Sequence, residues 1–379
     1  LAVLLADQDR WVQKLAALAM QGLGNAVATP EILTFLAVLL AIQDRWVRQV
    51  AARVVGILGS AAATPPILAG LADLLADPET EVRVAAARAV GGLGRAAATP
   101  PILAGLADLL ADPETEVRRV AVWAVERLGS AVATPEFLAG LSDLLAAPKT
   151  EVRKAAARVV REMGSAAAVP MILTRLADLL ADPETEVRRA AAEAVGRLGS
   201  AAARPPILAG LANLLAAPWY EGGRKAAAEA VEGLGSAAAT PEILAGLADL
   251  LVDPWYGEAA VKAVGSLGSA VATPEFLVRL ATLLANPEWR VWEAAAKAVG
   301  RLGSAVATPE FLVRLAALLA NPEWRVREAA AEAVGGLGSA AATSEFLACL
   351  ADLLVDPETE VRKVAAQAVG RLGSAAAVP

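Results

Sequence analysis

A run of the type Leu-Gly-Ser-Ala-Ala-Ala-Thr-Pro-Glu returns along the chain about every 35 residues, and this repeat limits the possible folds more than any other feature. A fixed period of this length indicates small supersecondary units that bury their apolar faces against one another. The repeat therefore predicts a solenoid. The glycine of its Leu-Gly pair falls at Gly24, Gly59, Gly94, Gly129, Gly164, Gly199, Gly235, Gly268, Gly303, Gly338 and Gly373.

The unit at residues 64–98 shows which element repeats. Thr64-Pro65 is typical of a helix start, because threonine accepts hydrogen bonds from the first amides and proline has the required φ. The apolar residues that follow have the spacing of an amphipathic helix of about three turns. They are Ile67, Leu68, Leu71, Leu74 and Leu75.

A second helix of about four turns is predicted to follow, with Asp77 as its cap, Pro78 in its first position and Gly94 as the left-handed residue after its end. Its buried residues are predicted to be Val82, Ala86, Ala89, Val90 and Leu93. The expected fold is all-α: a right-handed solenoid, or superhelix, of stacked antiparallel helix pairs.

The pattern resembles the HEAT repeat, in particular the short bacterial HEAT-like units also found in phycobilin lyases. The leucine-rich first helix and the segment Asp-Pro-x-x-x-Val-Arg carry this resemblance. It implies a HEAT/armadillo-like fold and a ladder of aspartates and arginines that ties adjacent units together. The ladder residues would be Asp77, Arg83, Asp112, Arg118, Asp182, Arg188, Asp356 and Arg362. We expect interruptions at Ile42, Ala147, Ala217, Asn286, Asn321, Gln13 and Trp292, where the repeat departs from this pattern.

The repeat predicts one HEAT-like solenoid over residues 1–379. Residues 1–28 form a truncated first unit, 29–203 five regular units, and 204–272 two irregular units of 36 and 33 residues. Residues 273–377 form three further regular units, and 378–379 begin another. Both ends therefore look cut from a longer array, and we expect a part of a larger multidomain protein.

Composition argues against most kinds of chemistry. The chain has no histidine and one cysteine, which excludes Ser-His-Asp and Cys-His pairs, HExxH zinc sites and cysteine metal clusters. A net charge of −7 counts against nucleic-acid binding. The longest uncharged stretch contains Gly, Ser and paired Pro, which argues against membrane insertion. We expect no enzyme, cofactor or metal, and a soluble chain for which the cytoplasm is favoured over secretion.

The two irregular units differ from the others at the turn into their second helix. This turn reads Ala-Pro-Trp-Tyr-Glu-Gly-Gly in one unit and Asp-Pro-Trp-Tyr-Gly in the next. The glycines predict that both second helices start late. Either the aromatic pairs serve as anchors for a partner, or they fill the site of an insertion and a deletion. The residues are Trp219, Tyr220, Trp255 and Tyr256.

Four more tryptophans, Trp11, Trp46, Trp289 and Trp324, are predicted in the first turn of a second helix. They either line a partner-binding rim or shield their own turns. Trp123 occupies a mid-helix position that is arginine or glutamate in other units, and is expected to be exposed. That position is basic early in the chain and acidic later, with Arg53, Arg88 and Arg158 followed by Glu193, Glu229 and Glu332. In HEAT folds this helix lines the concave side, so the groove would change sign along its length, unless the charges are only a solvated face.

These observations favour a non-catalytic scaffold that binds a protein or peptide through the concave second-helix face and the tryptophan rim. Self-association, head to tail, is a further expectation. Two alternatives stay open at this point. One is an accessory protein like the chromophore lyases, with a chromophore in the groove. The other is an engineered consensus array with no native ligand.

Overall fold

The computed structural model of the chain describes residues 28–217, 221–253 and 255–372, together with five isolated positions before residue 28. Helices alternate throughout these ranges, and no strand occurs in them. The predicted all-α fold of repeated helix pairs is confirmed. Trp11, Trp219 and Tyr220 lie outside the described residues, as do the last seven positions.

Each unit contributes a shorter first helix and, in all but one unit, a longer second helix. The first helices are α2 (Pro30–Leu40), α4 (Pro65–Leu75), α6 (Pro100–Leu110), α8 (Pro135–Leu145), α10 (Pro170–Leu179), α12 (Pro205–Ala216), α14 (Pro241–Leu251), α16 (Pro274–Leu284), α18 (Pro309–Leu319) and α20 (Ser344–Leu353). The second helices are α3 (Arg45–Leu58), α5 (Thr80–Leu93), α7 (Thr115–Leu128), α9 (Thr150–Met163), α11 (Thr185–Leu198), α13 (Glu221–Leu234), α15 (Gly257–Leu267), α17 (Trp289–Leu302), α19 (Trp324–Leu337) and α21 (Thr359–Leu372).

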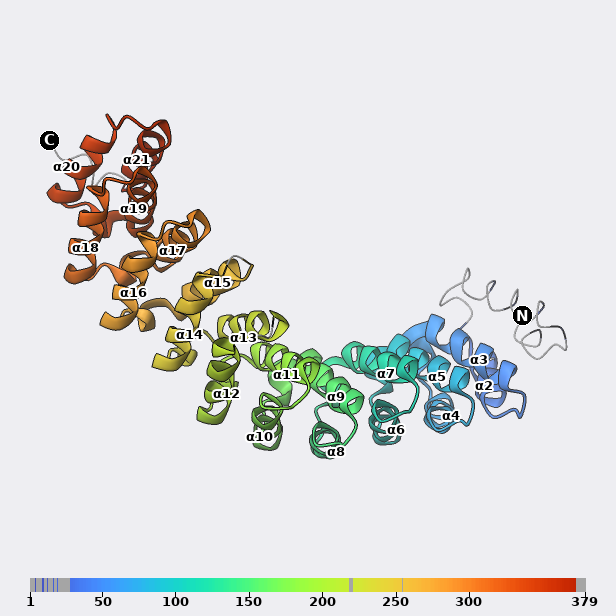
Figure 1. Cartoon of the computed structure of the whole chain (residues 1–379). Helices are drawn as coiled ribbons and strands as arrows, with labels where there is room; N and C mark the ends of the chain where they lie inside the picture. Colours follow the sequence, from blue (N-terminus) through green and yellow to red (C-terminus); the bar gives the residue numbers. More distant parts are fainter. Residues whose placement is uncertain are drawn as a thin grey trace. The chain divides into compact units, whose positions relative to one another are not determined.

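The chain divides into two compact units, residues 1–179 and residues 180–379. In the first unit, α2, α4, α6, α8 and α10 pack side by side in one layer, and α3, α5, α7 and α9 form the other. In the second unit, the first helices from α12 to α20 form one layer and the second helices from α11 to α21 form the other. Figure 1 shows these two rows of helices within each unit.

The first helices begin where the sequence predicts, but the threonine cap depends on the residue after the first proline. Thr134 precedes Pro-Glu, and its Oγ1 accepts a hydrogen bond from the N–H of Phe137 at 3.3 Å. Thr64 precedes Pro-Pro and makes no such bond, so the predicted cap is wrong there. The second proline places its Cδ where an amide hydrogen would stand, which crowds the position that Oγ1 would take.

The second helices begin later than the sequence suggests. Helix α5 starts at Thr80 with Glu79 as its N-cap residue, whereas Asp77 and Pro78 were predicted to start it. Asp77 acts before the helix, where its Oδ1 accepts from the N–H of Glu79 at 2.9 Å. The carboxylate therefore orders the turn between the two helices instead of capping the second one.

In the described residues, each second helix from α3 to α19 is followed by a third element that was not expected from the sequence. Gly94 follows α5 with φ +58° and ψ −143°, a backbone region that is essentially restricted to glycine. A single 3₁₀ turn, Gly94–Ala97, then leads to the next first helix, and its last residue, Ala97, is fully buried. The Gly-Ser-Ala-Ala segment that recurs along this chain therefore forms a packed turn and not a loose linker.

The small residues of the second helices let neighbouring backbones meet. The five residues predicted to be buried in α5 are almost completely buried, and Leu68 of α4 is half-buried. A Cβ placed on Gly92 would lie 2.4 Å from the main-chain oxygen of Gly56 in α3. The backbones of α3 and α5 are therefore too close at this point for any residue larger than glycine at position 92.

The two irregular units differ in their second helices. Helix α15 has 11 residues instead of 14, and begins at Gly257, so the predicted late start is confirmed there. Helix α13 keeps 14 residues, and the same prediction is wrong for it. In the unit of 36 residues, α12 has 12 residues where a regular first helix such as α4 has 11, whereas the unit of 33 residues loses the first turn of its second helix.

Candidate protein-interaction surface

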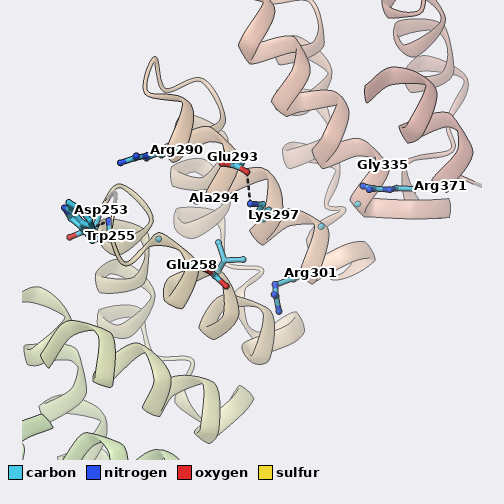
Figure 2. A pocket seen from close by; sticks show the side chains of 14 residues that line it. Asp253, Trp255, Glu258, Arg290, Glu293, Ala294, Lys297, Arg301, Gly335 and Arg371 are labelled. Carbon is cyan, nitrogen blue, oxygen red and sulfur yellow. Dashed lines mark hydrogen bonds and ion pairs between the residues drawn. The ribbon is translucent and has the colours of Figure 1, made fainter. Parts of the chain in front are cut away.

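The second-helix face of residues 180–379 contains a hollow of about 860 Å³. It runs along α15, α17, α19 and α21, with Trp255 near one end and Arg371 at the other (Figure 2). Its lining includes Gly300, Gly335 and Gly336. Gly336 has no side chain where the neighbouring repeats carry Arg301 and Arg371, and the missing first turn of α15 removes further side chains from this face. We call this hollow the α15–α21 groove.

Asp253 fixes the aromatic end of the groove. Its Oδ1 accepts hydrogen bonds from the N–H groups of Trp255 at 2.9 Å and Tyr256 at 3.2 Å. Its Oδ2 lies 3.1 Å from Nη1 of Arg224 in α13. These bonds hold the turn before α15 and leave the Trp255 side chain 82% exposed, while Tyr256 is half-buried. An exposed indole on an ordered turn is suited to contact a partner.

The carboxylates that line the groove all have cationic partners. Besides the Asp253 pair, Glu258 lies 3.3 Å from Nζ of Lys262, and Glu293 lies 2.7 Å from Nζ of Lys297. Their negative charges are therefore offset within the protein. The groove carries no uncompensated carboxylate among the residues that line it.

Two of the arginines that line the groove, Arg301 of α17 and Arg371 of α21, have no ion pair or hydrogen bond to any described side chain or main-chain group. The Arg301 stem lies over α15, because a Cβ on Gly265 would be 3.0 Å from it. The Arg371 stem lies over α19, 3.4 Å from the Cβ position of Gly335. Apolar support for the stems leaves both guanidinium groups available to a ligand.

Glu332 of α19 is the acidic group that influences this end of the groove. It is half-buried, and burial raises its pKa, with Glu293 acting in the same direction, while Lys297 and Arg371 act against this rise. It forms no ion pair within 4.0 Å in the part of the chain that the structure describes. Glu332 therefore weakens the positive potential of Arg371 without neutralising it.

The tryptophans predicted to form a rim are not equally exposed. Trp289 is 51% exposed, and the guanidinium of Arg290 lies 5.3 Å from its ring centroid. Trp324 and Trp46 are half-buried, with Arg325 and Arg45 at 5.1 and 5.8 Å from their rings. Trp289 and Trp324 stack with the arginine that follows them, and Trp46 with the arginine that precedes it, contacts that cover part of each ring. Among the described rim positions, Trp255 and Trp289 offer the most open aromatic surface.

In residues 1–179, one position of each second helix forms a row along α3, α5, α7 and α9. Arg53 and Arg158 are exposed, and Arg88 lies 3.0 Å from Glu116 of the next helix. Trp123 is 39% exposed, and its ring covers Gly91 of α5, whose Cβ would fall 2.3 Å from the ring. At the same position of the second helices in residues 180–379, Glu229 is exposed and lies 3.6 Å from Lys225, whereas Glu193 is half-buried.

The aspartates and arginines of the repeat meet between neighbouring units, at a spacing of 29 residues. Arg48 pairs with Asp77 at 2.8 Å, Arg83 with Asp112 at 2.8 Å and Arg327 with Asp356 at 2.7 Å. Each arginine also donates through Nη1 to main-chain oxygens of its own interhelical turn. Of the remaining ladder candidates, Asp182 and Arg188 are buried, and Arg362 donates to the main-chain oxygens of Asp356 and Pro357.

Arg118 differs from these arginines because the residue 29 positions on is Ala147. Its described bonds go to the main-chain oxygens of Asp112 and Pro113 and to Oγ1 of Thr115. It is only 8% exposed and has no carboxylate partner among the described residues. A buried guanidinium without a counter-charge is costly, so this junction is weaker than its neighbours.

The sequence analysis did not select Arg301, Gly336 and Arg371. The signal was present, because these residues occupy one register of the repeat, 35 positions apart. The charge pattern predicted from the sequence concerns a single position of each second helix, at which the later units are acidic. The groove takes its lining from further turns of the same helices, where the unpaired charges are positive.

The described residues show no cluster of three or more His, Cys, Asp or Glu side chains arranged to hold a metal ion. None of the helices in the described ranges combines the length and the apolar character needed to cross a membrane. Burial, together with Glu345 and Asp352, raises the pKa of the half-buried Cys349 thiol, which disfavours its thiolate form.

The sequence matches a family model described as HEAT repeats over residues 68–143, 138–230 and 312–379. Among proteins with curated descriptions, none matches the sequence. Among solved structures, Kap95p, from a structure describing its binding to RanGDP, is 16% identical with a TM-score of 0.62, and the match covers 99% of this chain and 56% of that one.

The karyopherin Kap121p, bound to the extreme C-terminus of the protein phosphatase Cdc14p, is 15% identical with a TM-score of 0.59 over 92% of this chain and 42% of that one. An engineered protein is 22% identical over 98% of this chain and 97% of that one, but its TM-score of 0.46 is too low to bear on the fold. The chain spans about half the length of Kap95p and less of Kap121p. At these identities the likeness shows the fold alone.

Proposed function

Since the chain belongs to the HEAT-repeat family, whose model matches more than half of its length, we propose that it is a non-catalytic scaffold for protein–protein interaction. It binds a protein or a peptide through the second-helix face and the tryptophans at its edge. In the described residues, Trp255 and Trp289 are the anchors of this contact. Trp219 and Tyr220 belong to the same proposal from their place in the sequence.

The observation that carries this proposal is the α15–α21 groove, with an indole 82% exposed near one end and, along it, two guanidinium groups that have no ion pair with any described residue. Aromatic and arginine side chains are the residue types that contribute most to binding at protein interfaces. Two of the similar solved structures also support binding of a protein or peptide: Kap121p was solved with the extreme C-terminus of Cdc14p, and Kap95p with RanGDP.

The row in residues 1–179 is a separate candidate surface for the same function. Arg53, Trp123 and Arg158 are exposed on consecutive or nearby second helices of one layer. They offer two cations and one indole. We assign them a supporting role, because a flat row excludes less water than a groove.

Photo-crosslinking tests the proposal. A photo-reactive amino acid is placed at residue 255 in the groove, and in a matched protein at residue 313 of α18, where Val313 is 67% exposed on the first-helix layer. After irradiation in an extract of the source cells, position 255 is expected to yield a discrete adduct that position 313 does not. Combined Trp255→Ala and Trp289→Ala substitutions are expected to remove a partner identified in this way.

Equal labelling at both positions would contradict the proposal, and so would an adduct that survives removal of both tryptophans. An adduct of two copies of the chain would assign the face to self-association. Visible absorbance of the purified protein would instead support a chromophore-binding accessory role. Each result is read from the same preparation.

A further inference from the structure

Arg301, Gly336 and Arg371 occupy the same register on α17, α19 and α21, which pack side by side. The central position has no side chain, and a Cβ on Gly336 would lie 2.3 Å from the Cα of Gly300. At this register, therefore, no side chain stands between the two arginines. Figure 2 shows Arg301 and Arg371 on different helices that border the same hollow.

The charge balance of the α15–α21 groove is set by which groups are already paired. Its carboxylates Asp253, Glu258 and Glu293 each lie within 3.3 Å of a cation. Lys297 is used in one of those pairs, and Arg290 stacks on Trp289. Among the charged residues that line the groove, only Arg301 and Arg371 have neither an ion pair nor an aromatic contact with a described residue. The groove thus carries two separate positive charges that a ligand can complement.

We propose that the α15–α21 groove binds an extended acidic segment of a partner protein, with one carboxylate on Arg301 and a second on Arg371. This inference rests on the scaffold function proposed above and adds the chemistry of the bound segment. Guanidinium groups bind carboxylates through paired hydrogen bonds, which gives both geometry and strength. Three carboxylates in the same lining oppose a continuous polyanion such as a nucleic acid, but leave room for two discrete negative charges.

The distance between the two arginines predicts the spacing in the ligand. Packed helices lie roughly 8–10 Å apart, so the two steps from α17 to α21 amount to roughly 16–20 Å. An extended chain covers about 3.3 Å per residue, so about six residues span this distance. Residues six positions apart in an extended segment also point to the same side. The expected pattern is therefore two acidic residues at positions i and i+6.

The test uses three fluorescent peptides with a background of serine and threonine. The first has two glutamates six positions apart, the second has the same glutamates three positions apart, and the third has glutamine in place of both. Fluorescence anisotropy at low ionic strength measures the affinity of the full chain for each. The first peptide is expected to bind at least about tenfold more tightly than either of the others, because only it can reach both guanidinium groups on one side.

Protein variants assign the effect to the two arginines. Arg301→Gln and Arg371→Gln are each expected to weaken binding of the first peptide about tenfold. The matched control is Arg314→Gln, which removes the same charge from an exposed position of α18 in the first-helix layer. It is expected to change the affinity less than twofold. Glu332→Gln is expected to tighten binding, because it removes the negative charge that opposes Arg371.

The inference is overturned if the glutamine peptide binds as well as the first, or if Arg314→Gln weakens binding as much as the groove variants. It is also overturned if both glutamate spacings bind equally. Circular dichroism of each variant shows whether the helices are intact, and neither arginine has a partner among the described residues whose loss would unfold the protein. Failure here leaves crosslinking at residue 255 unaffected, whereas failure of the scaffold function removes that adduct as well.

Discussion

Ala147 is the position where one substitution should strengthen a junction between two units. Its counterpart Asp112 has two roles, because Oδ1 accepts from the N–H of Glu114 at 2.8 Å and Oδ2 pairs with Arg83 at 2.8 Å. Ala147 provides neither contact, and Arg118 is buried opposite it without a carboxylate among its described partners. We predict that Ala147→Asp stabilises residues 1–179 by completing both contacts.

The matched variant Ala147→Asn separates the two contributions. Asn321, at the equivalent position of another unit, accepts from the N–H of Glu323 at 2.9 Å but carries no charge. A neutral hydrogen bond contributes about 1 kcal/mol, so Ala147→Asn should stabilise by about that amount. A hydrogen bond to a charged group contributes about 1.5–3 kcal/mol. Because Arg118 is already desolvated in the folded protein, only the new carboxylate adds a desolvation penalty.

We therefore expect Ala147→Asp to exceed Ala147→Asn by about 1.5 kcal/mol. Native-state hydrogen exchange of amides in α7 and α9 measures this difference locally, which suits an array whose units need not unfold together. The difference should disappear in an Arg118→Gln background. It should also be lost as the pH falls through the depressed pKa expected of the new carboxyl group. Equal stability of the two variants would refute the argument that Arg118 lacks a counter-charge.

Three further predictions concern stability. Trp292→Arg with Asn321→Asp should restore a ladder pair, and a double-mutant cycle in urea should give a favourable coupling of about 1 kcal/mol, whereas zero coupling would contradict it. Gly92→Ala should destabilise the protein by about 2 kcal/mol or more, since the new Cβ would meet the backbone of the neighbouring helix at 2.4 Å. Gly140→Ala should stabilise it by roughly 0.5–1 kcal/mol, because a Cβ at this position meets nothing within 4 Å. Urea denaturation measures both effects, and equal effects would count against the close approach of the helices at Gly92. The hydrogen bond from Arg327 holds the pKa of Asp356 below its usual value, so the carboxylate stabilises the protein near neutral pH and this effect is lost in acid. Asp356→Asn should therefore lower thermal stability at pH 7 but not at pH 2. A constant difference between the two proteins would argue against the pairing.

The fold could be predicted because every repeat carries the same sequence signals for the start, the buried face and the end of its helices. A proline at the first helical position, an amphipathic stripe and a glycine after Leu93 fix the helices of one unit, and the period copies them. The boundaries were less accurate where two local effects compete. The sequence predicts Asp77 as a helix cap, whereas its carboxylate accepts a hydrogen bond within the turn before α5, which begins at Thr80.

The groove was harder to foresee because it results from missing groups. The sequence shows that residues 240–272 are two residues short, but not that the loss falls on the first turn of α15 and leaves a hollow. Exposure of the tryptophans depends on a neighbour as well. Trp289 and Trp324 are both first residues of their helices, and both stack with the next arginine, yet only Trp289 is more than half exposed. One residue's place in the repeat does not determine what covers it.

The ladder shows why a lost charge has different consequences at different junctions. At one junction both partners are replaced by neutral residues, Trp292 and Asn321, and removal of both charges is nearly neutral in energy. Trp292 is 8% exposed, so apolar burial compensates there, although its indole N–H has no hydrogen-bond partner in the described structure. At the Arg118 junction only the acid is missing, and the buried cation remains. Restoring one carboxylate at Ala147 should consequently stabilise the protein more than rebuilding both partners of the other pair, which would first remove a packed tryptophan.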